Sequence, residues 1–452
     1  MLSKIAKYNL KHKPAECLSF ALLLIGVSYV MYFGERTSHA HLFFGFGIAV
    51  LGYLAAVQLK IKDAFWIGLI LRVLVLFALP NLSEDYFRFL WDGSLIKEGI
   101  SPFAYQPSDA ITFLGKSASN EQGVLTQLLS QMNSPNYYSV YPPLNQWMFF
   151  LAAQFSNVYT GMFVLKIFIL SAEVGVFFIL KKALQRFRKP VSKLNVYWLN
   201  PLVILELCGN IHFEGIMLFF FLLSAYYFAK VKDTEGAIYF SFSALTKLFS
   251  LMFLPLLALK IVGKRAVKFS LIVFVLVVIC FIPFFKGGNL SNFLESIDLY
   301  FQSFEFNSGL FYLVRYVGFE IVNYDVIQTA GPIFGLISFG MIMLISFLYR
   351  FRNRYAMFTG FLLINTVYLL FSPIVHPWYL VMLVGIGVLT DYKFPIVWSV
   401  LIFGSYCAYT AEGVVESKLY IAIEYTIVLF FLLRDIRTNF SFRKLKAGLT
   451  IT

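Results

Sequence analysis

Charged side chains are scarce in this sequence of 452 residues. Asp, Glu, Lys and Arg together make up 13% of the chain, about half of the roughly 25% that is typical of soluble domains. Hydrophobic residues make up 59%, and apolar runs of roughly 17 to 24 residues, the length that a bilayer-spanning helix needs, recur along the whole chain. The alternating ten-residue segments of a membrane β-barrel are missing. The composition therefore predicts an all-α, polytopic membrane protein.

Cysteine is also rare, and its four occurrences are isolated in apolar segments (Cys17, Cys208, Cys280 and Cys407). Because none has C-x-x-C or metal-ligand spacing, we interpret them as small buried hydrophobic residues. The chain has no internal repeat, no Walker or Rossmann glycine pattern and no long basic tract that would suit nucleic acid. We therefore expect no nucleic-acid partner and no cytosolic nucleotide-binding domain. No cofactor follows from the sequence, and dependence on a divalent metal stays open.

The apolar runs predict twelve membrane spans, at about 15–33, 40–59, 64–80, 161–181, 194–209, 214–230, 268–285, 326–349, 355–372, 378–391, 395–411 and 418–433. Two further apolar segments, 144–158 and 236–259, are predicted not to span fully. If 144–158 crossed the bilayer, the most basic loop of the chain (181–193) would face the outside. Basic residues flank 236–259 on both sides, so this segment is predicted to enter the membrane and return as two half-helices broken near Lys247.

The distribution of lysine and arginine predicts the orientation. With this assignment, 27 of the 37 Lys and Arg residues lie on the cytoplasmic side, as the positive-inside rule requires. Both termini are then cytoplasmic, and the first apolar segment is expected to be an uncleaved helix. We treat residues 1–452 as a single membrane domain. It has a long external loop at 81–143, expected to hold interfacial helices, and a cytoplasmic tail at 434–452.

The segment LPNLSEDYFRFLWDGSLIKEGISPFAYQPSD (79–109) gathers charges and aromatic side chains at the start of the external loop. Ser83 can cap a helix that begins at Glu84, and the pairs Glu84–Arg88 and Arg88–Asp92 are spaced i,i+4. One interpretation is therefore a charged, capped helix at the membrane interface. The other is a catalytic site, because Asp85 or Glu84 at the external mouth of a span could take a proton from a hydroxyl at the membrane surface.

Three further polar clusters fall on the same predicted side of the membrane: SVYPPLNQW (139–147), NPLVILELCGNIHFEG (200–215) and FSPIVHPWYLV (371–381). Each also has an ordinary structural interpretation. Two prolines start a helix, a histidine and a glutamate at i,i+2 are a weak metal signal, and Trp and Tyr are common at membrane interfaces. The candidate side chains in these clusters are Tyr141, Gln146, Asn210, His212, Glu214, His376, Trp378 and Tyr379.

Ionisable residues within the apolar segments form the last group. Lys247 either extends its charge to the cytoplasmic interface or, at a re-entrant break, offers a cation to an anionic lipid head group. Glu173, Glu206 and Glu424 lie within predicted spans, where a charge is unfavourable and marks a candidate functional site. A secondary transporter would use such residues as coupling sites, but the chain shows no related halves.

Five motifs in order, EDYFRFLWDGSLIKEGISPFAYQP, YPPLNQ, NPLVILELCGNIHFEG, the TK before the proline-broken apolar segment, and HPWYL, resemble those of glycosyltransferases of the C superfamily. Over residues 80 to 380 the chain is similar to bacterial polyprenyl-phosphate-mannose-dependent mannosyltransferases. The resemblance implies an inverting transfer of a sugar, expected to be mannose, from a polyprenyl phosphate to a glycan or lipid-linked acceptor. The transfer would occur at the external face of the cell inner membrane. The acid pair here is Glu-Asp, whereas some relatives have Asp-x-Asp.

The resemblance and the residue chemistry together assign a role to each candidate. Asp85 matches the general base of the family, and Glu84 is the second candidate. The cations expected to hold the donor phosphate are Arg88, Lys247 and Arg315. The expected contacts to the sugar or acceptor are Asp92, Tyr141, Gln146, Asn210, His212, Glu214, His376, Trp378 and Tyr379. The alternative function is that of a secondary transporter or a flippase for lipid-linked saccharides.

Overall fold

A computed structural model describes residues 2–114, 122–155, 157–261, 263–285, 287–302, 304–349 and 355–439. Within these residues the chain is helical apart from loops and one hairpin of two short strands, β1 (Tyr409–Thr410) and β2 (Gly413–Val414). The predicted tail 434–452 lies outside the described residues beyond position 439, as do positions 115–121 of the predicted external loop. The all-α prediction is confirmed for the described chain.

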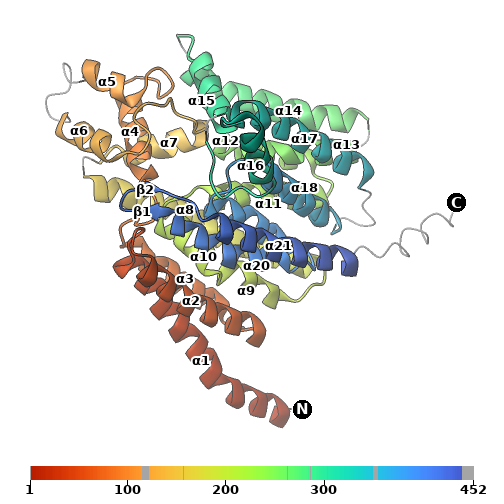
Figure 1. Ribbon diagram of the computed structural model, residues 1–452. Helices are drawn as coiled ribbons and strands as arrows, with labels where there is room; N and C mark the ends of the chain where they lie inside the picture. Colours follow the sequence, from red (N-terminus) through yellow and green to blue (C-terminus); the bar gives the residue numbers. More distant parts are fainter. Residues whose placement is uncertain are drawn as a thin grey trace.

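The helices follow one another through short connections, and α4 to α7 lie together at one side of the molecule (Figure 1). The elements are α1 (Leu2–Phe33), α2 (His39–Leu59), α3 (Ala64–Leu76), α4 (Asp85–Lys97), α5 (Pro107–Leu114), α6 (Gln122–Gln131), α7 (Pro143–Ala152), α8 (Val158–Arg186), η1 (Val191–Leu194), α9 (Asn195–Trp198), α10 (Pro201–Ile204), η2 (Leu205–Gly209), α11 (Glu214–Ala229), α12 (Asp233–Thr246), η3 (Leu248–Phe253), α13 (Leu254–Lys260), α14 (Lys264–Phe281), η4 (Ile282–Phe284), α15 (Leu290–Gln302), α16 (Leu310–Val322), α17 (Ile327–Leu348), α18 (Met357–Phe371), η5 (Pro377–Tyr379), α19 (Leu380–Gly387), α20 (Phe394–Leu401), η6 (Ile402–Ala408) and α21 (Lys418–Asn439).

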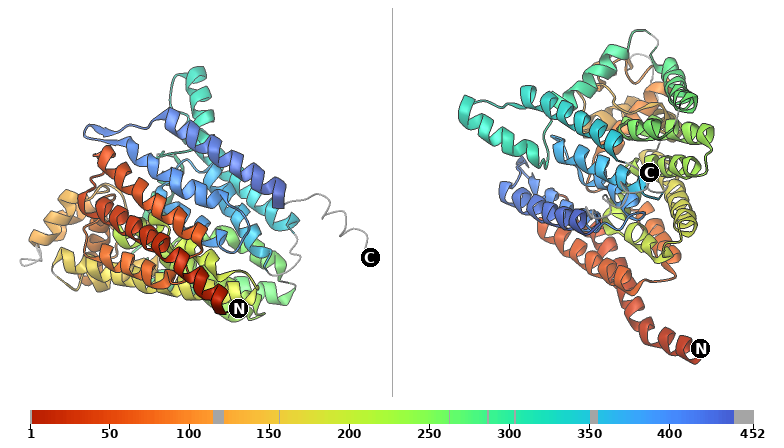
Figure 2. Two further views of the ribbon diagram at one scale, coloured as in Figure 1. Left: turned by 90° about the horizontal axis from the view of Figure 1, so that it is seen from below. Right: turned by 90° about the vertical axis from the view of Figure 1, so that its right-hand side faces the viewer.

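Five helices are long and apolar enough to cross a bilayer: residues 14–33 of α1, α2, α8, α14 with η4, and α17. The views of Figure 2 show α1 and α2 running side by side. A sixth span results if α10 with η2 and α11, which are bent by 110° at their junction, are counted as one. Within the described chain, the predicted twelve full spans are therefore not confirmed.

The count differs because several predicted spans are short apolar helices. For example, α3 has 13 residues and α18 has 15. At 1.5 Å per residue such helices measure about 20 Å, which is less than the roughly 30 Å of bilayer hydrocarbon. The helix α7 has only ten residues, so the prediction that 144–158 does not span agrees with the structure. The described residues thus form a multi-pass helical membrane protein in which full-length spans alternate with shorter helices.

Loops rich in lysine and arginine meet at one end of the bundle. Lys193 Nζ lies 2.6 Å from Asp391 Oδ1, and Arg186 donates to the Ala229 carbonyl at 3.4 Å. The connections that meet here, which we call the basic end, are 187–194, 230–232 and 390–393. The orientation prediction assigned these loops to one side of the membrane, and loops on one side must lie at one end of the bundle.

The segment predicted to enter and return is broken at Lys247, as expected. The helix α12 begins at Asp233 and ends before Lys247, whose backbone is extended (φ −149°, ψ 126°). The chain continues through η3 and α13, and Arg265 at the start of α14 then places its Nε 2.6 Å from Asp233 Oδ2. The chain has therefore come back to the level from which α12 started.

A buried ion pair joins α3 to α8 in the middle of the bundle. Arg72 NH2 lies 2.8 Å from Glu173 Oε2, and both side chains are fully buried. Arg72 also donates to the Trp198 carbonyl at 2.7 Å, and the Tyr197 hydroxyl donates to Glu173 at 2.5 Å. Because every charge here has a partner, the pair fixes three helical segments relative to one another.

Replacing Arg72 by methionine should leave the Glu173 carboxylate buried without its cation. Removal of one partner of a buried ion pair costs about 3–5 kcal/mol, so we expect Arg72→Met to lower the free energy of unfolding by that amount. The double variant Arg72→Met/Glu173→Leu should recover most of the loss, because it leaves no unpaired charge. Reversible unfolding of the detergent-solubilised protein, followed by circular dichroism, measures both, and equal destabilisation by the two variants would contradict this explanation.

Candidate active site

Six segments that are distant in the sequence meet at the end of the bundle opposite to the basic end. The helix α11 runs from Glu214 to Ala229, and Ala229 lies at the basic end, so Glu214 marks the other end, which we call the site end. Lys247 pairs with Glu214 there, and the Trp378 ring stacks on His212. The segments of the site end are 34–38, the start of α4, 205–214, Lys247, 372–379 and 406–410.

Arg36 neutralises Glu84, the first acid of the predicted site. Its guanidinium donates to both carboxylate oxygens of Glu84, at 2.8 and 2.5 Å, and lies 4.2 Å from the centre of the Tyr409 ring. A two-point pair of this kind fixes the carboxylate in one orientation. Glu84 therefore joins the 34–38 connection to the start of α4, and its negative charge already has a partner.

Asp85, the second acid, is the first residue of α4, so the helix begins one position later than predicted. The N-cap residue is therefore Glu84, whose side chain makes no capping hydrogen bond, and not Ser83 as predicted. Ser83, one position earlier, still accepts a hydrogen bond at its Oγ from the Asp85 backbone N–H at 3.2 Å. The Asp85 carboxylate accepts one hydrogen bond, from Asn133 Nδ2 at 3.0 Å. Among the described residues it forms no ion pair. Of the two adjacent acids, Asp85 alone keeps a carboxylate that no cation neutralises.

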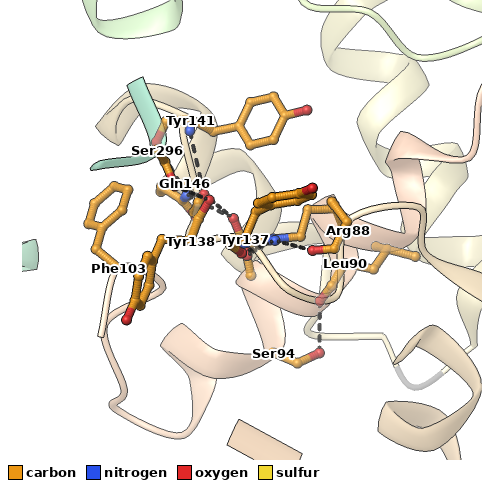
Figure 3. A network of polar contacts seen from close by, with 12 residues as sticks. Arg88, Leu90, Ser94, Phe103, Tyr137, Tyr138, Tyr141, Gln146 and Ser296 are labelled. Carbon is orange, nitrogen blue, oxygen red and sulfur yellow. Dashed lines mark hydrogen bonds and ion pairs between the residues drawn. The ribbon is translucent and has the colours of Figure 1, made fainter. Parts of the chain in front are cut away.

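Arg88 and Gln146 belong to a buried polar network behind Asp85 (Figure 3). Arg88 Nε donates to Asp92 Oδ1 at 2.7 Å, and its NH1 donates to the Tyr137 carbonyl at 2.8 Å. Gln146 Nε2 donates to Asp92 Oδ2 at 3.0 Å. The predicted i,i+4 pairing of Arg88 with Asp92 is confirmed. Arg88 NH2 and Gln146 Oε1 are buried without a hydrogen-bond partner among the described residues. The bonds that the two side chains do make hold α4 against the 134–141 segment.

Tyr141 and Gly93 complete the packing around this network. The Tyr141 ring extends away from the hydrogen bonds in Figure 3 and meets the Phe89 and Phe149 rings edge to face, at 4.9 and 5.5 Å between centroids. A Cβ atom at Gly93 would lie 2.1 Å from the Phe149 carbonyl oxygen. Only glycine therefore allows α4 to approach α7 this closely. Tyr141 thus packs between the two helices.

Asn210 connects the 205–213 turn to the loop that precedes Asp85. Its Oδ1 accepts from the backbone N–H groups of Asn81 and Leu82, at 3.0 and 2.9 Å. The next residue, Ile211, is buried and has φ +62°, a conformation that is strained for a β-branched side chain. The turn follows a π-helical segment, η2, and both features are enriched at functional sites.

Glu206 and Tyr406 orient His212. Tyr406 donates to Glu206 Oε1 at 2.8 Å, and His212 Nδ1 lies 2.9 Å from the Glu206 carbonyl and 3.2 Å from its Oε2. A carbonyl can only accept, so Nδ1 carries the proton of this hydrogen bond. In the neutral imidazole, Nε2 is then an acceptor. Nε2 is buried and has no hydrogen-bond partner among the described residues.

Four aromatic rings form a continuous stack beside Asp85. His212, Trp378, His376 and Phe306 follow one another with centroid distances of 3.9, 4.3 and 4.8 Å. Both faces of Trp378 are covered, so this indole cannot offer a face to a sugar ring, and it holds the two imidazoles instead. Burial lowers the pKa of His376 to about 3, with Asp85 opposing and His212 and Lys247 adding to this effect. His376 is therefore neutral near pH 7, and its buried Nδ1 has no partner among the described residues.

Lys247 provides a cation at the site end, where it forms an ion pair with Glu214. The Lys247 ammonium pairs with Glu214 Oε1 and lies 5.8 Å from the centre of the Tyr379 ring. Lys247 therefore points toward the site end, and the alternative in which it reaches the basic end does not fit this position. Arg315, the other predicted phosphate ligand, lies on α16 with two carboxylates, Glu305 Oε2 at 2.7 Å and Asp325 Oδ2 at 2.9 Å.

The structure adds residues that the sequence alone did not indicate. Arg36, Asn133 and Tyr406 contact Glu84, Asp85 and Glu206 respectively, and the Tyr409 ring lies against Arg36. Arg36 lies between two apolar runs on the predicted external side, and this position could have marked it as a candidate site residue. Tyr406 had no such signal because it falls inside the predicted span 395–411. The described residues contain no group of three or more His, Cys, Asp or Glu side chains that could hold a metal ion.

A helical membrane bundle with acids, imidazoles and the cations Arg36 and Lys247 at one end defines a membrane protein with a polar site at its surface. Residues 18–263 match the MptA_B family, described as alpha-(1->6)-mannopyranosyltransferase, N-terminal domain. The match covers more than half of the chain, which therefore belongs to this family of mannosyltransferases. It includes Asp85, Glu214 and Lys247 and ends before the 372–379 segment. The curated proteins contain no match to this chain.

Asn210 should be required for order in the loop before Asp85. Asn210→Ala removes the acceptor of two backbone N–H groups, and an unsatisfied buried group costs about 1–3 kcal/mol. We expect amide hydrogen exchange of a peptide containing Asn81 and Leu82 to become about fivefold faster or more, since 1.4 kcal/mol corresponds to a factor of ten. Asn195→Ala, near the basic end, is the matched control. Unchanged exchange at 81–82 in Asn210→Ala would show that this contact does not order the loop.

Proposed function

We propose that the protein transfers mannose from a polyprenyl phosphate to an acceptor hydroxyl at the site end, with Asp85 as the general base. The contrast between two adjacent acids carries this proposal. Arg36 neutralises Glu84, whereas the Asp85 carboxylate receives one hydrogen bond, from Asn133. A charged carboxylate at a partly exposed position can accept the proton of an acceptor hydroxyl. Family membership supports the mannosyl group as the one transferred.

In the proposed reaction, the acceptor oxygen attacks the anomeric carbon of the mannosyl group. Asp85 takes the hydroxyl proton as the glycosidic bond forms. The bond between the anomeric carbon and the phosphate oxygen breaks, and its electron pair leaves on the phosphate. Attack from the side opposite to the phosphate inverts the anomeric configuration. The products are the mannosylated glycan or lipid-linked acceptor and a polyprenyl phosphate, and Asp85 later releases its proton to water.

Lys247 is the cation that we propose for the donor phosphate. An ammonium group has three donors, of which Glu214 occupies one in the structure. Arg88 is less suited because its side chain is only 4% exposed, compared with 22% for Lys247. Arg315 is less suited because two carboxylates, those of Glu305 and Asp325, already bind it. The unpartnered nitrogens of His212 and His376 are proposed to meet hydroxyl groups of the sugar. A polyprenyl chain would extend into the surrounding lipid, where its hydrocarbon is solvated.

Asp85→Asn should lower mannosyl transfer by roughly 10²–10⁴-fold, the usual loss when a general base is removed. The amide is nearly isosteric but cannot take the proton at neutral pH, so donor binding should change much less. The measurement is initial-rate transfer from a panel of radiolabelled polyprenyl-phosphate sugars, among which the mannose donor should be the substrate. Glu84→Gln is the control and should retain turnover within about tenfold, because a partly exposed pair contributes little. Normal turnover in both variants would remove the basis for a base at this position.

The site end should face the outside of the cytoplasmic membrane, because the basic end is expected inside. In a background without the native cysteines, Thr112→Cys on α5 should react with an impermeant thiol reagent added to intact cells, and Lys189→Cys should not. Thr112 is exposed and Lys189 is in the basic 187–194 connection. Labelling of Lys189→Cys alone would reverse the orientation and place the site in the cytoplasm.

A further inference from the structure

The Lys247–Glu214 pair is unequally buried. The Lys247 side chain is 22% exposed, whereas that of Glu214 is 3% exposed. Glu214 Oε1 accepts from Lys247, and Glu214 Oε2 is buried without a hydrogen-bond partner among the described residues. The ammonium thus stands at the accessible side of the pair, and an uncompensated carboxylate oxygen stands behind it.

Separating Lys247 from Glu214 when an anion binds is energetically unfavourable. If Lys247 turned entirely to a phosphate, Glu214 would be left as a buried, unpaired charge, and breaking a buried pair in this way costs several kcal/mol. Lys247 has further donors for an entering anion. The phosphate of a ligand therefore binds to an ammonium that still carries Glu214, and every negative charge on that phosphate is placed near the Glu214 carboxylate.

The two lipid phosphates of the proposed reaction differ in charge. The donor is a phosphodiester with one negative charge. Once the anomeric carbon leaves, the product is a phosphomonoester, which carries about −1.5 to −2 charge at pH 7 because its second pKa is near 6. An isolated lysine would hold the dianionic product more tightly than the monoanionic donor, and product would then accumulate in the site.

We propose that Glu214 is a fixed counter-charge that selects the monoanionic donor over the dianionic product at Lys247 and so promotes product release. The proposal rests on the proposed function, because it takes Lys247 as the phosphate ligand. Glu214 touches Lys247 rather than a reacting atom, so it is a positioning and specificity residue. This role differs from the sugar contact that the sequence suggested for Glu214.

The test is a direct binding measurement on the purified full-length protein at pH 8. The ligands are a short-chain prenyl phosphate, which is dianionic at this pH, and its methyl diester, which is monoanionic. Glu214→Gln should bind the monoester at least tenfold more tightly than the wild type does, because at an effective dielectric constant of about 20 one like charge a few ångströms away costs more than a factor of ten in affinity. Binding of the diester should gain about half as much on a logarithmic scale, since the diester carries one charge instead of two.

Controls separate this proposal from the function on which it depends. Lys247→Met should weaken the binding of both ligands. Glu235→Gln should change neither affinity, because it alters a Lys–Glu pair with Lys232 at the other end of α12. If Lys247→Met has no effect, the phosphate site itself is wrong. A second outcome is that Lys247→Met weakens the binding of both ligands while Glu214→Gln changes both affinities equally or lowers the affinity for the monoester. In that case only the counter-charge role fails. Should Glu214→Gln not fold, the wild type decides: a tenfold preference for the monoester would overturn the proposal, and equal or weaker monoester binding would support it.

Discussion

A charge removed from water needs a partner, and this requirement determines which polar side chains of the bundle remain for chemistry. Arg72 and Glu173 neutralise each other within the helices, and Glu424 accepts hydrogen bonds from Trp398 and Asn307. Such groups are fully engaged, and a change at any of them would act first on stability. At the site end the same requirement is met only in part. Asp85 has an amide partner, and the imidazoles of the ring stack each keep a nitrogen that no described residue binds.

The engaged glutamates also bear on the alternative of a transporter. Coupling residues must change their protonation or their partners during a cycle, whereas Glu173 is held by both Arg72 and Tyr197. Glu206 holds His212 and Tyr406 in place, which explains an ionisable residue at this depth without ion coupling. These four contacts give Glu173 and Glu206 structural roles, and they agree with membership of a mannosyltransferase family.

The site depends on ties between segments that are far apart in the chain. Asn210 fixes the loop before α4, Arg36 fixes Glu84, and the ring stack joins the 205–213 turn to the 372–379 segment. The turn itself includes the strained residue Ile211. Strain of this kind costs of order 1–3 kcal/mol and persists only where surrounding contacts enforce it. The positions of Asp85 and Lys247 are thus consequences of the whole bundle rather than of their own helices.

The helical membrane class, the break at Lys247 and the grouping of the basic loops could all be predicted from the sequence. These features follow from hydropathy, charge and local spacing, which act over short stretches of chain. The sequence also indicated Asp85, Lys247, His212 and His376 as candidates, because polar residues near apolar runs are conspicuous. The predicted number of full spans is not confirmed for the described residues, because hydropathy does not report where a helix bends or stops, as at the junction of η2 and α11. Three other features could be seen only in the folded chain: Arg36 neutralises Glu84, Arg88 and Gln146 bind Asp92, and both faces of Trp378 are covered. The partners of these side chains come from distant segments of the sequence, and they meet only when the bundle closes.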